Sequence, residues 1–324
     1  MPNDNSNSTE SKKTKVTITL DENLVNQIDS EVKKRNYSSR SNAIEVLLKS
    51  FIPKADTALF LLSGVDRVFK KDRELPLILE ELRNLVKQGV RNITISYNES
   101  DVEFYKELRK EVNKIEMENK GVKITTDYPH STNGDASTLI YFNYESSRFN
   151  ALLVIHGTVL RGTDGNKVDY RKLYEYHLSH EADLTMVLGD LNLHDPDLIE
   201  QEINEKDAKL DHLKSQTRVL LEGTEVKAIY KFQEKKNQKN LTSVEKRAID
   251  SSLVDLGLYV INPSLIKYIR NQIKKHPESF ASFTVRHPDH LDIKSVIENL
   301  IENGRNVSGY VFAGRWFHFR RLKE

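Results

Sequence analysis

An apolar run ends on three residues that could handle a ligand. Residues 152–156 read Leu-Leu-Val-Ile-His, and Gly157 and Thr158 follow directly. In α/β proteins, working polar groups gather at the carboxyl ends of such buried strands. A threonine hydroxyl can orient a ligand or satisfy the strand end, but it cannot replace the carboxylate oxygens that Mg²⁺ prefers. The residue types at this strand end therefore argue against a magnesium site.

The histidines offer a second kind of chemistry. An imidazole suits a transition metal, so His156 could share one with His318 near the C-terminus. Two imidazoles lack a third ligand, however, and do not make a metal site on their own. His177 and His180 lie three positions apart on an expected helix, where packing or surface exposure explains them better than metal binding does. The histidines thus predict no metal, no cofactor and no catalytic group.

Composition narrows the function classes. The chain has 324 residues, a net charge of +1 and no cysteine. Without cysteine there is no disulfide framework, thiol catalysis or thiolate-bound zinc. The polar start of the chain lacks the apolar segment of a secretory signal, and no apolar run approaches the roughly 18 residues of a membrane helix. We therefore expect a cytoplasmic protein with no membrane partner.

The first fifty residues predict a small α/β unit. Residues 1–14 contain little to bury and predict a disordered tail, whereas residues 15–20 alternate apolar and polar side chains as a half-buried strand does. Asp21 is a plausible N-cap for a helix that ends near residues 35–36, and a second helix begins at residues 38–39 and stops before residue 53. A lone strand and two helices cannot form a stable core, so we expect two chains to pair.

This unit resembles the ribbon-helix-helix DNA-binding domain of Arc, MetJ and CopG-type repressors over residues 15–53. The resemblance implies a homodimer whose paired strands enter the DNA major groove and read base edges through Lys15, Thr17 and Thr19. It also implies that the N-terminus of the second helix holds a phosphate through the backbone amides of Ser39, Arg40 and Ser41. Residues 1–54 contain nine Lys or Arg and seven Asp or Glu, which leaves open a dimerisation or antitoxin-like module that does not touch DNA.

The rest of the chain alternates between strands and helices. Apolar runs predict strands at 57–64, 91–97, 121–128, 151–157, 182–190, 257–261 and 309–314, and a hairpin at 218–234. Amphipathic stripes predict helices around 77–86, 101–118, 169–181, 263–275 and 292–303. Such alternation is typical of a mostly parallel sheet that is covered by helices on both faces.

The order of these segments resembles the sugar-phosphate nucleotidyltransferases, which join a nucleoside triphosphate to a sugar-1-phosphate and release pyrophosphate. Six stretches carry the resemblance: 61–69, 133–139, 169–188, 232–235, 253–269 and 302–319. It implies an α/β fold, in which a Rossmann-like nucleotidyltransferase-type domain at residues 55–324 follows the ribbon-helix-helix. It also implies that a nucleotide or nucleotide-sugar would lie near Gly64, Arg67, Gly134, Thr158, Glu234 and Lys235.

The chain departs from that family at charged positions. The family holds Mg²⁺ with two aspartates, and this chain has Thr158 and His318 in their places. Where the family has a lysine before the proline of its first loop, this chain has Glu74-Leu75 before Pro76. Without the metal, phosphoryl transfer loses the ion that neutralises charge on the phosphates. These losses predict a pseudoenzyme.

Other carboxylates could restore a metal site. Asp66 and Asp135 lie near the expected cleft, although solvated loop positions account for both.

Taken together, the two resemblances predict a nucleoid-associated, DNA-binding transcriptional regulator whose degenerate domain acts as a sensor or assembly module. The alternatives are an active nucleotidyltransferase with a rearranged metal site and an architectural or DNA-segregation protein.

Overall fold

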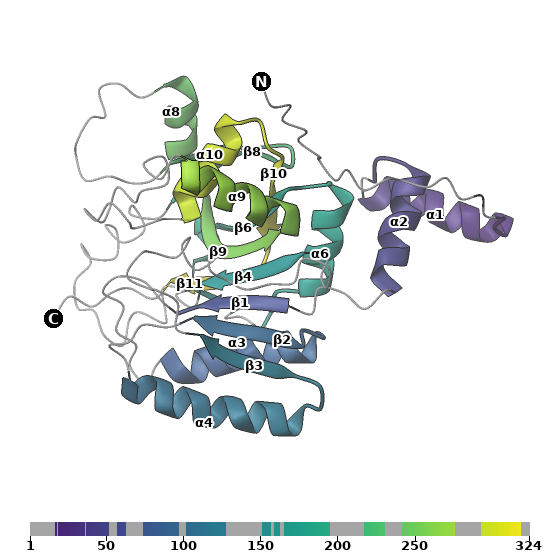
Figure 1. The fold of residues 1–324 in the computed structure, drawn as a ribbon. Helices are drawn as coiled ribbons and strands as arrows, with labels where there is room; N and C mark the ends of the chain where they lie inside the picture. Colours follow the sequence, from purple (N-terminus) through teal and green to yellow (C-terminus); the bar gives the residue numbers. More distant parts are fainter. Residues whose placement is uncertain are drawn as a thin grey trace, which may run out of the picture.

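The chain forms two helices at its N-terminus, followed by a large α/β domain (Figure 1). The computed structural model describes residues 17, 19–35, 37–51, 57–62, 74–96, 102–127, 151–156, 159–162, 165–194, 217–230, 242–275 and 293–318. Among these residues, no helix is long and apolar enough to cross a membrane.

The two N-terminal helices have the predicted lengths. Helix α1 spans Glu22–Arg35, and helix α2 spans Arg40–Phe51. The Asp21 carboxylate accepts a hydrogen bond from the Asn23 backbone N–H at 2.8 Å, as expected of a residue that caps α1. The two helices enclose a small cluster of buried side chains formed by Ile28, Tyr37, Ala43 and Val46.

The strand predicted over residues 15–20 is not formed at its described positions, because Thr17, Thr19 and Leu20 have no strand assignment. A β-strand needs a neighbouring strand for its backbone hydrogen bonds. The partner predicted from the sequence is the same segment of a second chain, and one chain alone cannot provide it.

The α/β domain is built on a nine-stranded sheet with the order β3-β2-β1-β4-β9-β6-β10-β8-β7. Its strands are β1 (Thr57–Leu61), β2 (Asn92–Ser96), β3 (Lys123–Asp127), β4 (Leu152–His156), β6 (Leu184–Asp190), β7 (Arg218–Glu222), β8 (Glu225–Tyr230), β9 (Leu253–Ile261) and β10 (Val307–Phe312). Strands β3, β2, β1 and β4 are parallel neighbours, as are β6 and β10. Strand β9 runs antiparallel between β4 and β6, and β7 and β8 form the predicted hairpin.

Helices cover both faces of the sheet, as the alternating pattern predicted. Helices α3 (Glu74–Lys87), α4 (Val102–Glu118) and α6 (Tyr170–Ser179) pack on one face, and α9 (Pro263–Lys275) and α10 (Ile293–Glu302) on the other. Successive strand residues point to opposite faces. Phe60 accordingly joins the core beneath α3 and α4, whereas its neighbours Leu59 and Leu61 join the core beneath α9 and α10.

Four short elements were not predicted. Helix α8 spans Ser243–Ile249, and the strands β5 (Val159–Arg161) and β11 (Trp316–His318) form a separate antiparallel pair. The 3-10 turn η3 (Leu191–Leu193) follows β6. Strands of three residues are too short to show a periodic pattern, so only the folded chain reveals the pairing of β5 with β11.

The N-terminal helices contact the α/β domain through α6, and Figure 1 shows α2 lying beside that helix. Leu178 of α6 packs against the small cluster of α1 and α2, and it also packs against the large core beneath the sheet. The Leu178 side chain therefore joins the small cluster of α1 and α2 to the core between the sheet and α3, α4 and α6.

Candidate functional site

The carboxyl ends of four neighbouring parallel strands lie in a row along one side of the sheet, where these strands end. Asp127 of β3 pairs in register with Ser96 of β2. Ser96 in turn pairs with Leu61 of β1, and Leu61 pairs with His156 of β4. In open α/β sheets, ligands bind at this edge, beyond the ends of the strands. The strand end that carries His156 is therefore central to the candidate site.

Strands β5 and β11 bring two distant segments together next to this strand end. Val159 is the residue after Thr158, and it pairs in register with His318. Thr158 and His318 occupy the places in which the resemblance puts the two metal-binding aspartates. The fold thus brings the residue that follows Thr158 beside His318, although Thr158 itself lies outside the described residues.

Trp316 fastens β11 to the end of β6. Its side chain is fully buried, and its indole N–H donates to the backbone oxygen of Asp190 at 2.9 Å. Strand β6 approaches so closely that a Cβ at Gly189 would lie 2.7 Å from Trp316 Nε1. Only glycine permits this contact, so the ends of β6 and β11 are held in a fixed relation.

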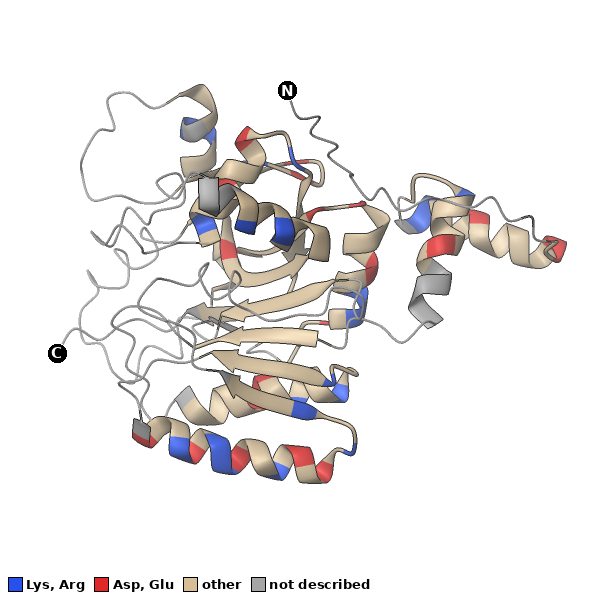
Figure 2. Ribbon diagram, in the orientation of Figure 1, with Lys and Arg blue, Asp and Glu red and all other residues tan. Residues whose placement is uncertain are grey.

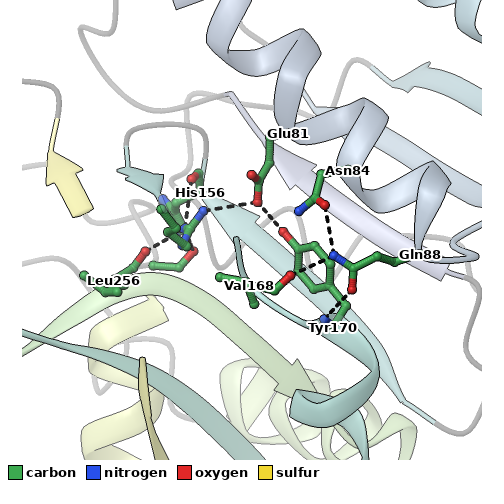
Figure 3. A network of polar contacts seen from close by, with 9 residues as sticks. Glu81, Asn84, Gln88, His156, Val168, Tyr170 and Leu256 are labelled. Carbon is green, nitrogen blue, oxygen red and sulfur yellow. Dashed lines mark hydrogen bonds and ion pairs between the residues drawn. The ribbon is translucent and has the colours of Figure 1, made fainter. Parts of the chain in front are cut away.

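A buried arginine ties the end of β4 to β9. The Arg161 side chain is 1% exposed, and its Nη2 donates to the backbone oxygens of His156 at 3.3 Å, Leu256 at 2.6 Å and Gly257 at 3.1 Å. Its Nη1 lies 3.7 Å from a carboxylate oxygen of Glu81 on α3. Figure 3 shows this network extending from the strand ends to α3.

The same carboxylate accepts a hydrogen bond from the hydroxyl of Tyr170, the first residue of α6. Burial, followed by the nearby charge of Glu81, raises the pKa of this phenol well above its usual value, so Tyr170 remains the proton donor. The backbone N–H of Tyr170 donates to Gln88 Oε1 at 2.7 Å, and Gln88 Nε2 donates to the Val168 oxygen at 2.7 Å. The start of α6 is therefore held against α3 (Figure 3).

His156, His177 and His180 have partners within the fold. His177 is buried, its Nδ1 lies 2.9 Å from Thr185 Oγ1, and burial lowers its pKa to about 3. His180 stacks on the Tyr176 ring at a centroid distance of 4.0 Å. His156 packs edge-on against Tyr259, with the ring centroids 6.2 Å apart. These contacts agree with the packing role that the sequence favoured for His177 and His180.

The residues predicted to contact DNA are solvent-exposed where the structure describes them. Thr17, Thr19, Ser39, Arg40 and Ser41 are exposed, and Lys15 lies outside the described residues. Ser39 Oγ accepts from the Asn42 backbone N–H at 3.1 Å, so Ser39 caps α2. Figure 2 shows charges of both signs on α1 and α2 rather than a uniformly basic face.

Arg40 has a partner that the sequence did not suggest. Its guanidinium forms two hydrogen bonds to the Asp29 carboxylate on α1. This contact holds the pKa of Asp29 below its usual value. A DNA phosphate that bound the Arg40 side chain would have to compete with this carboxylate.

The remaining predicted ligand-binding residues lie outside the described residues: Gly64, Arg67, Gly134, Thr158, Glu234 and Lys235. Asp66 and Asp135 also lie outside them. Within the described part of the chain, no group of three or more His, Asp or Glu residues could hold a metal ion. A hydroxyl and an imidazole at positions 158 and 318 do not fit the carboxylate pair that Mg²⁺ prefers.

The family of the chain follows from its sequence match together with this topology. The family model described as "Nucleotidyl transferase" matches residues 66–318. The chain belongs to the nucleotidyl transferase family. A second model, "Ribbon-helix-helix protein, copG family", matches residues 14–53, so a module of a DNA-binding and dimerising family precedes the nucleotidyl transferase domain.

Curated relatives of the nucleotidyl transferase domain are distant and longer. A glucose-1-phosphate adenylyltransferase of Clostridium perfringens (strain SM101 / Type A) is 22% identical over 62% of this chain and 43% of its own length. One of Fusobacterium nucleatum subsp. nucleatum is 24% identical over 49% of this chain and 31% of its own length. The chain therefore spans less than half the length of these curated relatives.

Two solved structures match most of this chain at low sequence identity. A UDP-glucose pyrophosphorylase complexed with UDP-glucose gives a TM-score of 0.50 at 14% identity, covering 80% of this chain and 91% of its own. An inositol-1-phosphate CTP transferase from T. maritima gives a TM-score of 0.46 at 14% identity, covering 82% of this chain and 89% of its own.

These matches contradict the prediction of a pseudoenzyme. That prediction depended on residue types at a few positions, notably Thr158 and His318, whereas the family match extends over residues 66–318 and the curated relatives are named as enzymes. Different residues at two positions do not remove the fold that the family model matches, and orientation of the reactants alone contributes several kcal/mol to enzyme catalysis. The matches therefore point to an enzyme rather than to a pseudoenzyme.

The sequence analysis missed the buried network of Arg161, Glu81 and Tyr170. One signal could have found it, because Glu81 falls on the apolar stripe of its helix, three positions after Ile78 and four before Leu85. A carboxylate on a buried stripe requires a buried partner. The identity of that partner, about 80 residues away, is not encoded in any local pattern.

Proposed function

We propose that the protein is a DNA-binding nucleotidyltransferase that transfers a nucleotidyl group from a nucleoside triphosphate to a sugar-1-phosphate. The observation that carries this proposal is the family match over residues 66–318 on a sheet whose β5–β11 pairing joins the segments of positions 158 and 318. The names of the curated relatives support a sugar-1-phosphate as the acceptor.

The proposed reaction is a displacement at phosphorus. A phosphate oxygen of the acceptor forms a bond to the α-phosphorus of the triphosphate, the bond from that phosphorus to the bridging oxygen breaks, and pyrophosphate leaves. Arg67 and Lys235 would neutralise phosphate charge, and the backbone at Gly64 and Gly134 would approach the phosphates closely. Thr158 and Glu234 would orient the ligand.

Pyrophosphate release tests the catalytic proposal. The full chain would be incubated with each nucleoside triphosphate, with glucose-1-phosphate as the acceptor, and with Mg²⁺, Mn²⁺ or Zn²⁺ in parallel. We expect pyrophosphate release that depends on the acceptor, and Arg67→Ala with Lys235→Ala should lower it at least tenfold. No release with any triphosphate and cation would refute the proposal for this acceptor class.

The N-terminal module would bring this enzyme to DNA as a homodimer. Two chains would pair residues 15–20 as antiparallel strands, with Lys15, Thr17 and Thr19 facing the major groove and Ser39, Arg40 and Ser41 facing a phosphate. The module would then occupy residues 15–53, and the nucleotidyltransferase domain residues 55–324. Transcriptional regulation is the role that such a dimer performs most directly.

Footprinting tests the DNA-binding proposal. A short palindromic protected site would support a regulator, whereas long spreading protection would refute it in favour of an architectural protein. Replacing Thr17 and Thr19 together by alanine should abolish sequence preference and leave the dimer intact, because base contacts specify and phosphate contacts only position. Unchanged operator binding by this double variant would show that the assigned strand face is wrong.

A further inference from the structure

Arg161 is a buried cation whose hydrogen bonds go to backbone oxygens of two strands. It is the last residue of β5, and its Nη2 contacts the backbone oxygens of His156, Leu256 and Gly257. His156 is the last residue of β4, where the chain leaves the sheet toward the segment that carries Thr158. One guanidinium thus holds both the end of β4 and the neighbouring part of β9.

The part of β9 that it contacts is irregular. The pairing of β9 with β6 shifts register between Tyr259 and Asp255, so Leu256 and Gly257 lie at a bulge. Gly257 has a φ of +62°, and a Cβ there would lie 2.9 Å from His156 Cβ. Bulges leave backbone groups outside the regular ladder and are frequent beside active sites. The Arg161 guanidinium supplies the hydrogen bonds for the two oxygens at this bulge.

Stability alone does not account for a buried ion pair at this place. Replacing such a pair by apolar side chains of similar volume is often neutral or stabilising. The Arg161–Glu81 pair fixes geometry instead, because the planar guanidinium holds its acceptors in set directions. Tyr170 completes the arrangement by donating to Glu81, which restricts the carboxylate from the side of α6.

We propose that Arg161 is a positioning residue for nucleotidyl transfer, and that Glu81 and Tyr170 hold its guanidinium in place. The network fixes His156 at the end of β4 and Arg161 at the end of β5, and thereby the register of β5 against β11 at the candidate site. This inference rests on the proposed function, because it assigns the network to that reaction.

A matched pair of tyrosine variants tests the proposal. Tyr170→Phe removes the hydroxyl that donates to Glu81, whereas Tyr176→Phe removes a hydroxyl on the same helix that donates to the Gly309 backbone oxygen at 2.7 Å. Each variant loses a hydroxyl that donates a hydrogen bond, but only Tyr170 belongs to the network. Thermal unfolding followed by the fluorescence of Trp316, the only tryptophan, would show that both variants fold.

We expect Tyr170→Phe to lower kcat about tenfold with KM for the triphosphate changed less than about threefold, because misplacing reacting groups by about 1 Å costs up to about 100-fold in rate. Arg161→Lys, which keeps the charge but loses the planar fork, should lower kcat further. Tyr176→Phe should keep the kcat of the unsubstituted chain. Equal kcat values for the two tyrosine variants would overturn the proposal, whereas an inactive unsubstituted chain would refute the proposed function itself.

Discussion

Gly257→Ala should destabilise the α/β domain more than the same change at Gly223, although both glycines have nearly the same backbone conformation. Their φ angles are +62° and +60°. An alanine in this left-handed region costs about 1–2 kcal/mol at either position. At Gly257 the new Cβ would also lie 2.9 Å from His156 Cβ, whereas nothing lies within 4 Å at Gly223.

The difference between the two variants isolates the steric contribution. Forcing an extra methyl group into a packed site costs about 1–3 kcal/mol. We therefore expect Gly257→Ala to lower the free energy of unfolding by about 2–5 kcal/mol, and Gly223→Ala by about 1–2 kcal/mol. For a domain of this size, a difference of about 2 kcal/mol corresponds to about 4–8 °C in Tm.

Urea unfolding followed by Trp316 fluorescence measures both variants in the full chain. Trp316 is buried beside Asp190 at the end of β6, so its emission reports on the domain that contains Gly257 and Gly223. If the two variants differ by less than about 0.5 kcal/mol, the close approach of β9 to His156 does not exist in solution and the reasoning is refuted.

Three further predictions concern charge, pH and the contact between the two parts of the chain. Asp29→Asn should free Arg40 from its ion pair and thereby raise the affinity for DNA. The slope of the logarithm of affinity against the logarithm of salt concentration should steepen by up to about 0.9, the value of one phosphate contact. Competition binding at several salt concentrations measures the affinity and this slope. Since His177 has a pKa lowered to about 3 in the fold and an ordinary pKa near 6.5 when unfolded, its contribution to stability is present above about pH 6.5 and is lost as pH falls toward 3; His177→Gln should flatten the pH dependence of Tm in that range. Leu178→Asp should break the contact of α6 with α2 and make the chain between α2 and the α/β domain easier to cleave in limited proteolysis, because the aspartate would place a charge in both hydrophobic clusters.

Controls separate these effects from general ones. Glu22→Gln removes the same charge from the same helix as Asp29→Asn, so an equal gain in DNA affinity would show that net charge, and not Arg40, is responsible. His180→Gln is the control for His177→Gln. If it flattened the pH dependence of Tm equally, the assignment of that dependence to the buried His177 would be contradicted. Leu24→Asp alters an exposed leucine of α1, and proteolysis as fast as that of Leu178→Asp would deny a specific role for the α6 contact.

Most of the fold could be predicted from local patterns. The helix predicted at residues 263–275 has the same bounds in α9, and the hairpin predicted at 218–234 is formed by β7 and β8. These elements bury one stripe or one alternating face, so their periodicity is visible in a window of about ten residues. The strand of residues 15–20 is the exception, because its hydrogen-bonding partner is expected from another chain.

The candidate site was predicted only in part. The resemblance indicated that positions 158 and 318 belong together, and the pairing of Val159 with His318 agrees with it. The residue types at those positions led to the wrong conclusion about catalysis, because a few substituted ligands were weighed above a match that extends over the domain.

The sequence by itself determined the order of the longer helices and strands, the two families to which its parts belong and the absence of thiol chemistry. Only the tertiary structure decided that Arg161 meets Glu81, that β5 pairs with β11, and that Leu178 joins the two hydrophobic cores. The physical reason is the distance along the sequence between the residues that interact. Periodic burial is a property of neighbouring residues, whereas a buried charge finds its partner only when the sheet closes and brings distant strand ends within hydrogen-bonding distance.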